Sequence, residues 1–532
     1  MSDATPGNLI NDPRLARAVS NITDRSEKQR DLEVLKDTYV DTGVLQQVAN
    51  DANQILYGRR GTGKTHVLQV LGAELADQQG SHVIYLDVRV LGSAHTFLDE
   101  TKPVAERCVA VFKDLLSLIQ HKLLEIVTSP DSDGRGLQEV SDFADVVTRK
   151  TAEVNSRTIT DRAAHTSESG AVADVSLSPQ KTGFGINATD KAIDSTAREV
   201  EYTEALRQSL VFSEVFIILE RALTAIGADR LTLLIDEWTS LPVDLQPFIA
   251  EFMKRSLFPS NRITVKIASL EYRSRFTLAR PGNPIGFELG PDIKANLDLD
   301  DYYVYERNPE NVVNVFHELL YKHVTSGMGE ETLRQYGVRD PVSFRSRLFT
   351  ERATFVELVR AGEGVARDFL GIFSSAFFKA KTTGRQKIDL NSVEEAARDW
   401  YETDKSTALS DAQRTALHRI ISDVIGNRQT KMFMLSREHA SNAMVQSLFD
   451  LRLIHLMSRG YSDKENPGQR YNIYALDYGT YVDLKRTKAE PGDFITEEET
   501  DTDARADRIV PFADKRSIRR VILQTEIFDD LL

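Results

Sequence analysis

Eight consecutive residues near the N-terminus have the types and the spacing of a phosphate-binding loop. The run is Gly58-Arg59-Arg60-Gly61-Thr62-Gly63-Lys64-Thr65, between an apolar strand-like segment and a helix-like one. Its glycines let backbone N–H groups approach phosphate oxygens, and the following helix adds its positive dipole end. Lys64 would contact the β- and γ-phosphates, and the Thr65 hydroxyl would bind Mg²⁺. The loop predicts binding of ATP or GTP, against the simpler interpretation of a Gly-rich turn between strand and helix.

A second acidic element suits the same chemistry. An apolar run at 231–235 ends in Asp236 and Glu237, as expected of a buried parallel strand with functional residues at its carboxyl end. Asp236 would hold Mg²⁺ directly or through water, and Glu237 would act as the general base on the attacking water. The alternative is an ordinary core strand that ends in a solvated acidic turn.

Composition favours a multidomain enzyme of a reducing cytoplasm. The 532 residues are 41% hydrophobic and 27% charged, which suits roughly three domains of usual size. We expect no secretion signal at the N-terminus and no membrane span. The single cysteine, Cys108, excludes an intramolecular disulfide and a cysteine metal site. A formal net charge of −14 argues against a chain that coats nucleic acid, although one basic face remains compatible with it.

Apolar patterns around the loop predict alternating strands and helices. We expect strands at 55–57, 82–88, 231–235, 263–268 and 293–299, and helices from the loop to about 79, at 104–127 and at 202–226. The polar residues 1–46 are predicted to form an arm across this core. Residues 129–199, rich in Ser, Thr, Asp and Gly, are predicted to be an insertion.

Within that insertion, alternating apolar residues at 171–177 and 184–188 flank a turn and predict a β-hairpin. An isolated hairpin is marginal in water, so its apolar face should be covered. The hairpin is expected either to pack on its own domain or to have a role in contact with another subunit, as a pore loop or in sensing.

The order of these motifs resembles the core of AAA+ ATPases. Loop, Asp-Glu strand and a later strand that ends in Ser269 follow one another as in that family, which implies that Ser269 contacts the γ-phosphate or the attacking water. Farther on, Asn308 and Pro309 are predicted to cap and start a lid helix to about 324. A Gly-x-x-Arg sequence ending in Arg367 resembles the second sensor of the lid, particularly in origin-recognition ATPases. The resemblance implies that Arg367 contacts the γ-phosphate; the alternative is an ordinary surface arginine.

The same family completes its site with an arginine from a neighbouring subunit. Arg273, Arg275 and Arg280 lie shortly after Ser269, where the resemblance implies this arginine, and the sequence leaves the choice open. The resemblance therefore implies a homo-oligomer.

The C-terminal part resembles a winged-helix domain. Helices are predicted at 411–425 and, capped by Ser436, at 437–451, followed by strands at 453–457 and 471–476. Three well-separated helices before the hairpin are not evident. Residues 436–488 hold eight Lys or Arg against six Asp or Glu, a weak electrostatic footprint for duplex DNA. The alternative is a protein-interaction domain. The candidate DNA contacts are Arg437, Arg459, Lys464 and Arg470.

Together these patterns predict an α/β fold: a P-loop AAA+ core with a parallel sheet, a helical lid and a C-terminal α+β winged-helix-like domain. The predicted boundaries are an arm at 1–46, the core at 47–305, the lid at 306–404, the winged-helix-like domain at 405–488, and an acidic linker and tail at 489–532. The tail docks back on the body or on a partner. The predicted function is Mg²⁺-dependent ATP hydrolysis coupled to oligomer assembly and to DNA or protein binding.

Two alternatives stay open. One is a signalling or defence switch in which nucleotide drives assembly with a protein effector and turnover is incidental. The other is a DNA-binding regulator in which nucleotide is mainly structural.

A shared site predicts that ATP turnover per subunit rises steeply with protein concentration, because an arginine supplied in trans is worth roughly 10³–10⁵ in rate in related nucleotidases. The measurement is steady-state ATP hydrolysis over a dilution series, with and without duplex DNA. Turnover that is flat and negligible, with tightly held nucleotide, would favour the switch.

Overall fold

The predicted motifs lie together at the carboxyl ends of the strands of a parallel sheet. The computed structural model describes residues 7–22, 29, 31–91, 97–130, 132–148, 211–462, 468–485, 487, 491, 522–528 and 531. These residues form a sheet of five parallel strands in the order β2-β3-β4-β1-β7. The strands are β1 (Gln54–Tyr57), β2 (Ser81–Asp87), β3 (Arg230–Asp236), β4 (Ile263–Ser269) and β7 (Lys294–Asp298). Each strand predicted in this region is present within one or two residues.

The strands are buried on both faces, which explains their continuous apolar runs. On one face Leu56, Leu234 and Ala268 pack against α4 (Lys64–Ala76) and α3 (Val44–Val48). On the other face Leu233 and Ile267 belong to a cluster with α5 (Val104–Thr128), α9 (Phe212–Ala225) and α10 (Gln246–Ser256). Neighbouring residues of one strand thus serve opposite faces, as the two-residue period of a strand requires.

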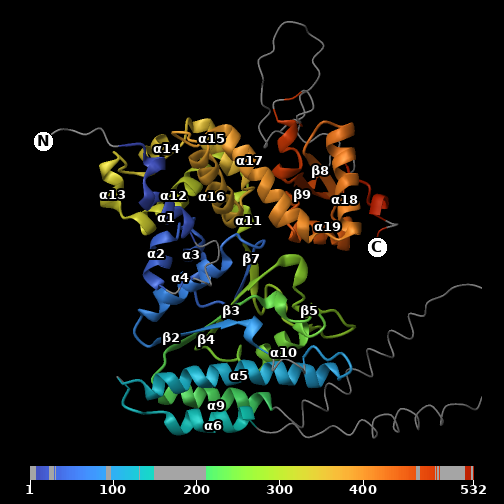
Figure 1. Cartoon of the computed structure of the whole chain (residues 1–532). Coiled ribbons are helices and arrows are strands. Elements are labelled where there is room, and N and C mark those ends of the chain that lie inside the picture. Colours follow the sequence, from blue (N-terminus) through green and yellow to red (C-terminus); the bar gives the residue numbers. More distant parts are fainter. Residues whose placement is uncertain are drawn as a thin grey trace, which may run out of the picture.

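A helical layer lies at the end of the core that is remote from the lid (Figure 1). It consists of α5, α9 and α6 (Leu137–Thr148), and α6 packs against both others. α6 lies within the range 129–199 that the sequence predicts as an insertion, so part of this range is a packed element of the core. Helix α9 is the described part of the helix predicted at 202–226. The predicted hairpin at 171–188 lies outside the described residues.

The single cysteine belongs to this layer. Cys108, on α5, is fully buried, and burial raises the pKa of its thiol well above the usual value. Among the described residues no helix is both long and apolar enough to cross a bilayer.

The lid is a helical unit beyond β7. Asn308 accepts a hydrogen bond from the Asn311 backbone N–H and Pro309 occupies the first helical turn, which confirms the predicted start of this lid helix. Helix α16 begins at Ala366, after Gly364 in a left-handed conformation (φ +75°). The lid helices are α12 (Pro309–Met328), α13 (Glu330–Gln335), α14 (Pro341–Leu348), α15 (Arg352–Ala361), α16 (Ala366–Thr382) and α17 (Leu390–Trp400).

The N-terminal segment bridges lid and core. Helix α1 (Pro13–Ser20) packs on α12, and α2 (Leu32–Thr38) contacts both α12 and α4. The short α11 (Asp300–Tyr303) follows β7, and the small hairpin of β5 (Thr277–Leu278) and β6 (Ile285–Gly286) lies against α10.

The C-terminal domain, from α18 to β10, is a small α+β unit beside the lid (Figure 1). It contains an antiparallel sheet in the order β8-β10-β9. Its elements are α18 (Asp411–Ile421), β8 (Met432–Ser436), α19 (Ala443–Asp450), β9 (Ile454–Ser462) and β10 (Arg470–Leu476). Helix, strand, helix and hairpin follow in the order of a winged helix, as predicted.

Three local predictions for this domain differ from the structure. The helix predicted at 437–451 begins only at Ala443, because the Asn442 side chain, and not Ser436, caps it. Ser436 instead ends a strand paired with β10. The strand predicted at 453–457 extends to Ser462 because β10 pairs along it.

Leu523 and Phe528 of the tail are buried on this domain, so the described part of the tail docks back on the body.

Lys266, in the middle of β4, is 2% exposed and donates to the Ala52 carbonyl at 2.8 Å. Burial lowers the pKa of this ammonium to about 7, although Asp51 opposes the shift. Between about pH 7 and about pH 10 the unfolded chain therefore binds more protons at this site than the folded one, so folding stability should rise with pH across this window.

Replacing Lys266 by Met should raise the melting temperature below about pH 7, and the gain should shrink towards pH 9, by up to about 1.4 kcal/mol per pH unit in unfolding free energy. Thermal unfolding at several pH values measures it, with exposed Lys122→Met as the control. A gain that does not change with pH would contradict this account of Lys266.

Candidate nucleotide-binding site

The loop between β1 and α4 has the backbone that its glycines permit. Gly61 and Gly63 lie in the left-handed region, with φ of +84° and +98°. A Cβ on Gly58 would lie 2.7 Å from Thr62 Oγ1, and one on Gly61 would lie 2.8 Å from Arg367 Cβ. A side chain at Gly58 would therefore distort the loop itself, and one at Gly61 would force the loop and the lid apart.

Lys64 begins α4 and its ammonium lies over the loop. Its Nζ donates to the carbonyl oxygens of Gly58 and Arg59 at 2.7 and 2.8 Å. Burial lowers the pKa of this ammonium, while the Asp236 carboxylate raises it. A cation that is short of solvent and faces a cavity is well placed to bind an anion.

Asp236 connects the loop to two strands of the sheet. Its Oδ2 accepts hydrogen bonds from Thr65 Oγ1 at 2.6 Å and from the Tyr85 hydroxyl at 2.8 Å. The carboxyl group is 2% exposed, and its Oδ1 accepts from the Glu237 backbone N–H. A hydroxyl and a carboxylate at this distance fit the hard oxygen shell that Mg²⁺ prefers. The predicted pair of Thr65 and Asp236 is therefore brought together.

Sequence reasoning missed Tyr85. It lies on β2, which pairs with β3 so that Tyr85 is opposite Leu234 and Asp87 opposite Asp236. The available signal was a tyrosine within the predicted strand two residues before its acidic end.

Glu237 follows Asp236 with a left-handed backbone (φ +56°), which is uncommon for a residue with a side chain. Such strain costs about 1–3 kcal/mol and is concentrated at functional sites. Glu237 and Asp236 line the same cavity, which is described below. Ser269, at the end of β4, is buried and hydrogen-bonded to the Ser274 hydroxyl.

These side chains surround a single cavity of about 330 Å³. Core and lid both contribute to it. Its lining includes Arg60, Lys64, Thr65, Asp236, Glu237, Ser269, Leu319, His323, Arg367 and Leu370. The lid contributes the apolar Leu319 and Leu370 to the lining. Burial lowers the pKa of His323 to about 4, so its ring is neutral at pH 7.

Arg367 brings a cation from the lid to the cavity. Its backbone N–H donates to the Gly61 carbonyl at 3.1 Å, so lid and loop touch. Among the described residues its buried Nε has no hydrogen-bond partner. A buried, unpartnered guanidinium nitrogen beside a cavity suits an anionic ligand.

The arginines predicted to act in trans differ in their surroundings. Arg273 forms an ion pair with Asp450 of α19, in the same chain. Arg275 is exposed, and in the described part of the chain only its backbone N–H has a partner, the Gln246 side chain at 2.7 Å. Arg280 is partly buried. Of the three, Arg275 is the one open to a neighbouring subunit.

The four candidate DNA contacts also differ in their surroundings. Arg459 binds Glu271 at 2.7 Å and Asp298 at 2.6 Å, so its charge is already neutralised by the core. Arg437 and Arg470 are exposed at the ends of β8 and β10. Lys464 lies outside the described residues.

Comparison with known proteins gives structural resemblances only. No family model matches the sequence, and no curated protein matches it. The solved structures that resemble the chain include Aeropyrum pernix ORC2 in ADPNP–ADP complexes, at 12% identity and a TM-score of 0.34, covering 85% of this chain and 97% of that one. Cdc6p from Pyrobaculum aerophilum follows at 11% and 0.31, with 85% and 97% covered. Drosophila ORC bound to DNA has 12% and 0.29, with 91% and 94% covered.

At these identities and TM-scores, the fold is established by this chain's own geometry. The decisive observations are the parallel strand order β2-β3-β4-β1-β7, the loop after β1, the acidic pair after β3 and the lid beyond β7. The fold is of the AAA+ type. The α/β fold predicted from the sequence is confirmed, with an AAA+ core, a helical lid and a winged-helix-like C-terminal unit.

Replacing Arg367 by Ala should weaken binding of ATP by roughly 10- to 150-fold, because a hydrogen bond to a charged group is worth about 1.5–3 kcal/mol. Titration of the full chain with a fluorescent ATP analogue measures it. The matched control is Arg352→Ala, an exposed lid arginine at the start of α15. Equal affinity in the Arg367 variant would contradict a contact with nucleotide.

Proposed function

We propose that this chain binds ATP with Mg²⁺ and hydrolyses it. The observation that carries the proposal is the meeting of four groups from three elements around one cavity: Lys64 and Thr65 at the start of α4, Asp236 at the end of β3, and Glu237 in the turn after it. The three chemical requirements of phosphoryl transfer are charge stabilisation, metal binding and orientation of water, and each has a candidate group here.

Each residue would have a distinct task. The loop N–H groups and Lys64 would hold the phosphates, and Leu319 and the neutral His323 of the lid would contact the base. Thr65 and Asp236 would hold Mg²⁺, which when bound neutralises developing phosphate charge. Glu237 would accept a proton from the attacking water, while Ser269 would orient that water or the γ-phosphate.

Two features support coupling of the nucleotide to larger movements. Arg367 reaches the cavity from the lid and its backbone contacts the loop, so a γ-phosphate there would draw lid and core together. Arg275 is exposed and suits completion of the site by a neighbouring copy in a homo-oligomer. Duplex DNA as the partner of the C-terminal domain would depend on Arg437 and Arg470, since the core occupies Arg459.

A second function, a nucleotide-controlled switch with little turnover that acts on a protein effector, has specific support. Arg273 pairs with Asp450 of the C-terminal domain, and Arg459 pairs with Asp298 of the core. These two arginines, which the sequence predicts to act in catalysis in trans or in DNA binding, instead attach the C-terminal domain to the core. A switch that is held closed needs such contacts more than a rapid ATPase does.

Two substitutions should separate binding from chemistry. Lys64→Ala should weaken nucleotide binding by roughly 10- to 150-fold, because its charged hydrogen bonds to phosphate are lost. Glu237→Gln should retain binding and lower kcat by about 10²–10⁴, the usual contribution of a general base.

Equilibrium titration with nucleotide and steady-state phosphate release measure the two effects, with surface Glu330→Gln as the control. Wild-type turnover in Glu237→Gln would overturn the assigned chemistry. Tight binding with negligible turnover in the unmodified chain would favour the switch.

A further inference from the structure

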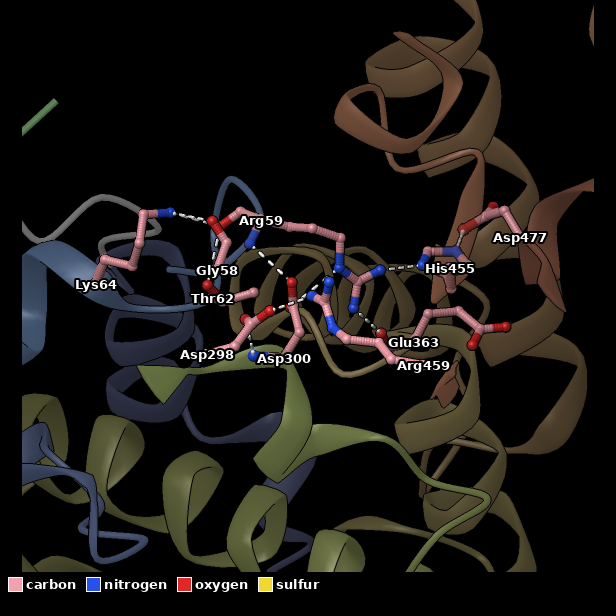
Figure 2. A network of polar contacts seen from close by, with 10 residues as sticks. All are labelled: Gly58, Arg59, Thr62, Lys64, Asp298, Asp300, Glu363, His455, Arg459 and Asp477. Carbon is pink, nitrogen blue, oxygen red and sulfur yellow. Dashed lines mark hydrogen bonds and ion pairs between the residues drawn. The ribbon is translucent and has the colours of Figure 1, made fainter. Parts of the chain in front are cut away.

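The C-terminal domain reaches the phosphate-binding loop through Arg59. This side chain is 5% exposed and, unlike its neighbour Arg60, does not line the cavity. It points into the junction between core, lid and C-terminal domain, towards Asp300, Glu363 and His455 (Figure 2). Its Nε donates to Asp300 Oδ1 at 3.0 Å, one terminal N–H donates to the Glu363 carbonyl at 3.1 Å, and the other contacts His455 Nδ1.

His455 is the member of this group that belongs to the C-terminal domain. It lies in β9 and is fully buried. Burial, with the Arg59 guanidinium as the next cause, lowers the pKa of the imidazole to about 4, so the ring is neutral at pH 7. Because Nδ1 accepts from Arg59, the proton lies on Nε2, which donates to Asp477 Oδ2 at 2.9 Å.

The contacts continue from His455 to the lid. Asp477 forms an ion pair with Lys405, whose Nζ also lies 3.1 Å from Asp368 of α16. Burial raises the pKa of Asp477, but Lys405 and His455 outweigh it and hold the pKa below its usual range. A continuous chain of polar contacts thus runs from the loop through β9 to the lid.

Helix α19, also in the C-terminal domain, contacts the core through its last two residues. The Phe449 ring has the Arg59 guanidinium 5.8 Å from its centroid and packs edge-on against Tyr272, and Asp450 pairs with Arg273. The eight residues Ala443–Asp450 include no Lys or Arg. Helix α19, which precedes the hairpin of β9 and β10, therefore packs against the core, and its sequence offers no cation to the phosphates of DNA.

Arg59 cannot move without moving the loop. Its backbone N–H donates to Asp300 Oδ2 at 2.9 Å, and its carbonyl accepts from Lys64 at 2.8 Å and from Thr62 Oγ1 at 2.9 Å. If the C-terminal domain moved away, the Arg59 guanidinium would lose the His455 nitrogen and the Phe449 ring. It would then be exposed to water, where a long side chain takes several conformations. The docked domain therefore holds the loop in the shape described above, and such preorganisation strengthens binding.

We propose that His455 is a positioning residue for the phosphate-binding loop, through which docking of the C-terminal domain and binding of nucleotide strengthen each other. The inference rests on the proposed nucleotide binding at the loop. By reciprocity of linked equilibria, nucleotide holds the C-terminal domain in place to the same extent that the docked domain tightens nucleotide binding. A partner that covered the inward face of α19 would accordingly release nucleotide.

The first test is the affinity of the full chain for mant-ADP. His455→Phe removes the acceptor for Arg59 and should raise the dissociation constant by about 5- to 150-fold, the usual range of coupling between sites. His455→Gln keeps an acceptor for Arg59 and a donor for Asp477, so it should recover most of the affinity. His418→Phe, the same substitution at an exposed site on α18, should bind as the unmodified chain does.

The second test is hydrogen exchange of residues 443–462 with and without ADP. Nucleotide should slow exchange there in the unmodified chain and in His418→Phe, but not in His455→Phe. Asp450→Asn provides a variant that loosens docking without removing a hydrogen bond of the loop. It should also raise the mant-ADP dissociation constant, although it removes a negative charge near Lys64 and Arg60, which alone would favour an anion. It keeps the test decisive if His455→Phe fails to fold by circular dichroism.

The outcomes separate cleanly. Unchanged affinity in His455→Phe and Asp450→Asn, or an exchange response retained in His455→Phe, would overturn the coupling. Weak binding in His455→Phe that His455→Gln does not restore would show a merely structural role and overturn it as well. If the unmodified chain binds no mant-ADP while Lys64→Ala behaves identically, the proposed nucleotide binding fails and the inference falls with it.

Discussion

The buried guanidinium of Arg59 is the contact at which the phosphate-binding loop, the lid and the C-terminal domain meet. Arg59 is almost completely withdrawn from water, and a charge in that position must be neutralised and hydrogen-bonded to be tolerated. Its partners come from the end of the core sheet (Asp300), from the lid (Glu363) and from the C-terminal domain (His455). Three parts of the chain that are far apart in sequence thus contact one residue of the loop.

The sequence predicts well those features that depend on neighbouring residues. The loop from Gly58 to Thr65 and the strand that ends in Asp236 are specified by local spacing and by the apolar period, and the structure places both beside one cavity. The start of α12 is equally local, since Asn308 and Pro309 act within one turn. Such patterns require no knowledge of distant partners.

What the sequence did not predict depends on distant partners. Nothing next to Arg59 distinguishes it from Arg60, although one enters the junction between domains and the other lines the cavity. As a cation near the predicted wing, Arg459 is a predicted DNA contact, whereas in the structure Glu271 and Asp298 of the core neutralise it. The helix predicted from 437 begins only at Ala443, because the Asn442 side chain caps it and the preceding residues are not helical in the α form.

The buried position of Cys108 makes the movement of these domains open to spectroscopy. It is the chain's only cysteine, it has no exposed surface, and its raised pKa keeps the thiolate scarce. The natural sequence therefore offers almost no background to a thiol-reactive dye or spin label. A cysteine introduced on an exposed residue of the core and another on the C-terminal domain would carry the labels alone, so the distance between the two domains can be followed in an otherwise unaltered protein.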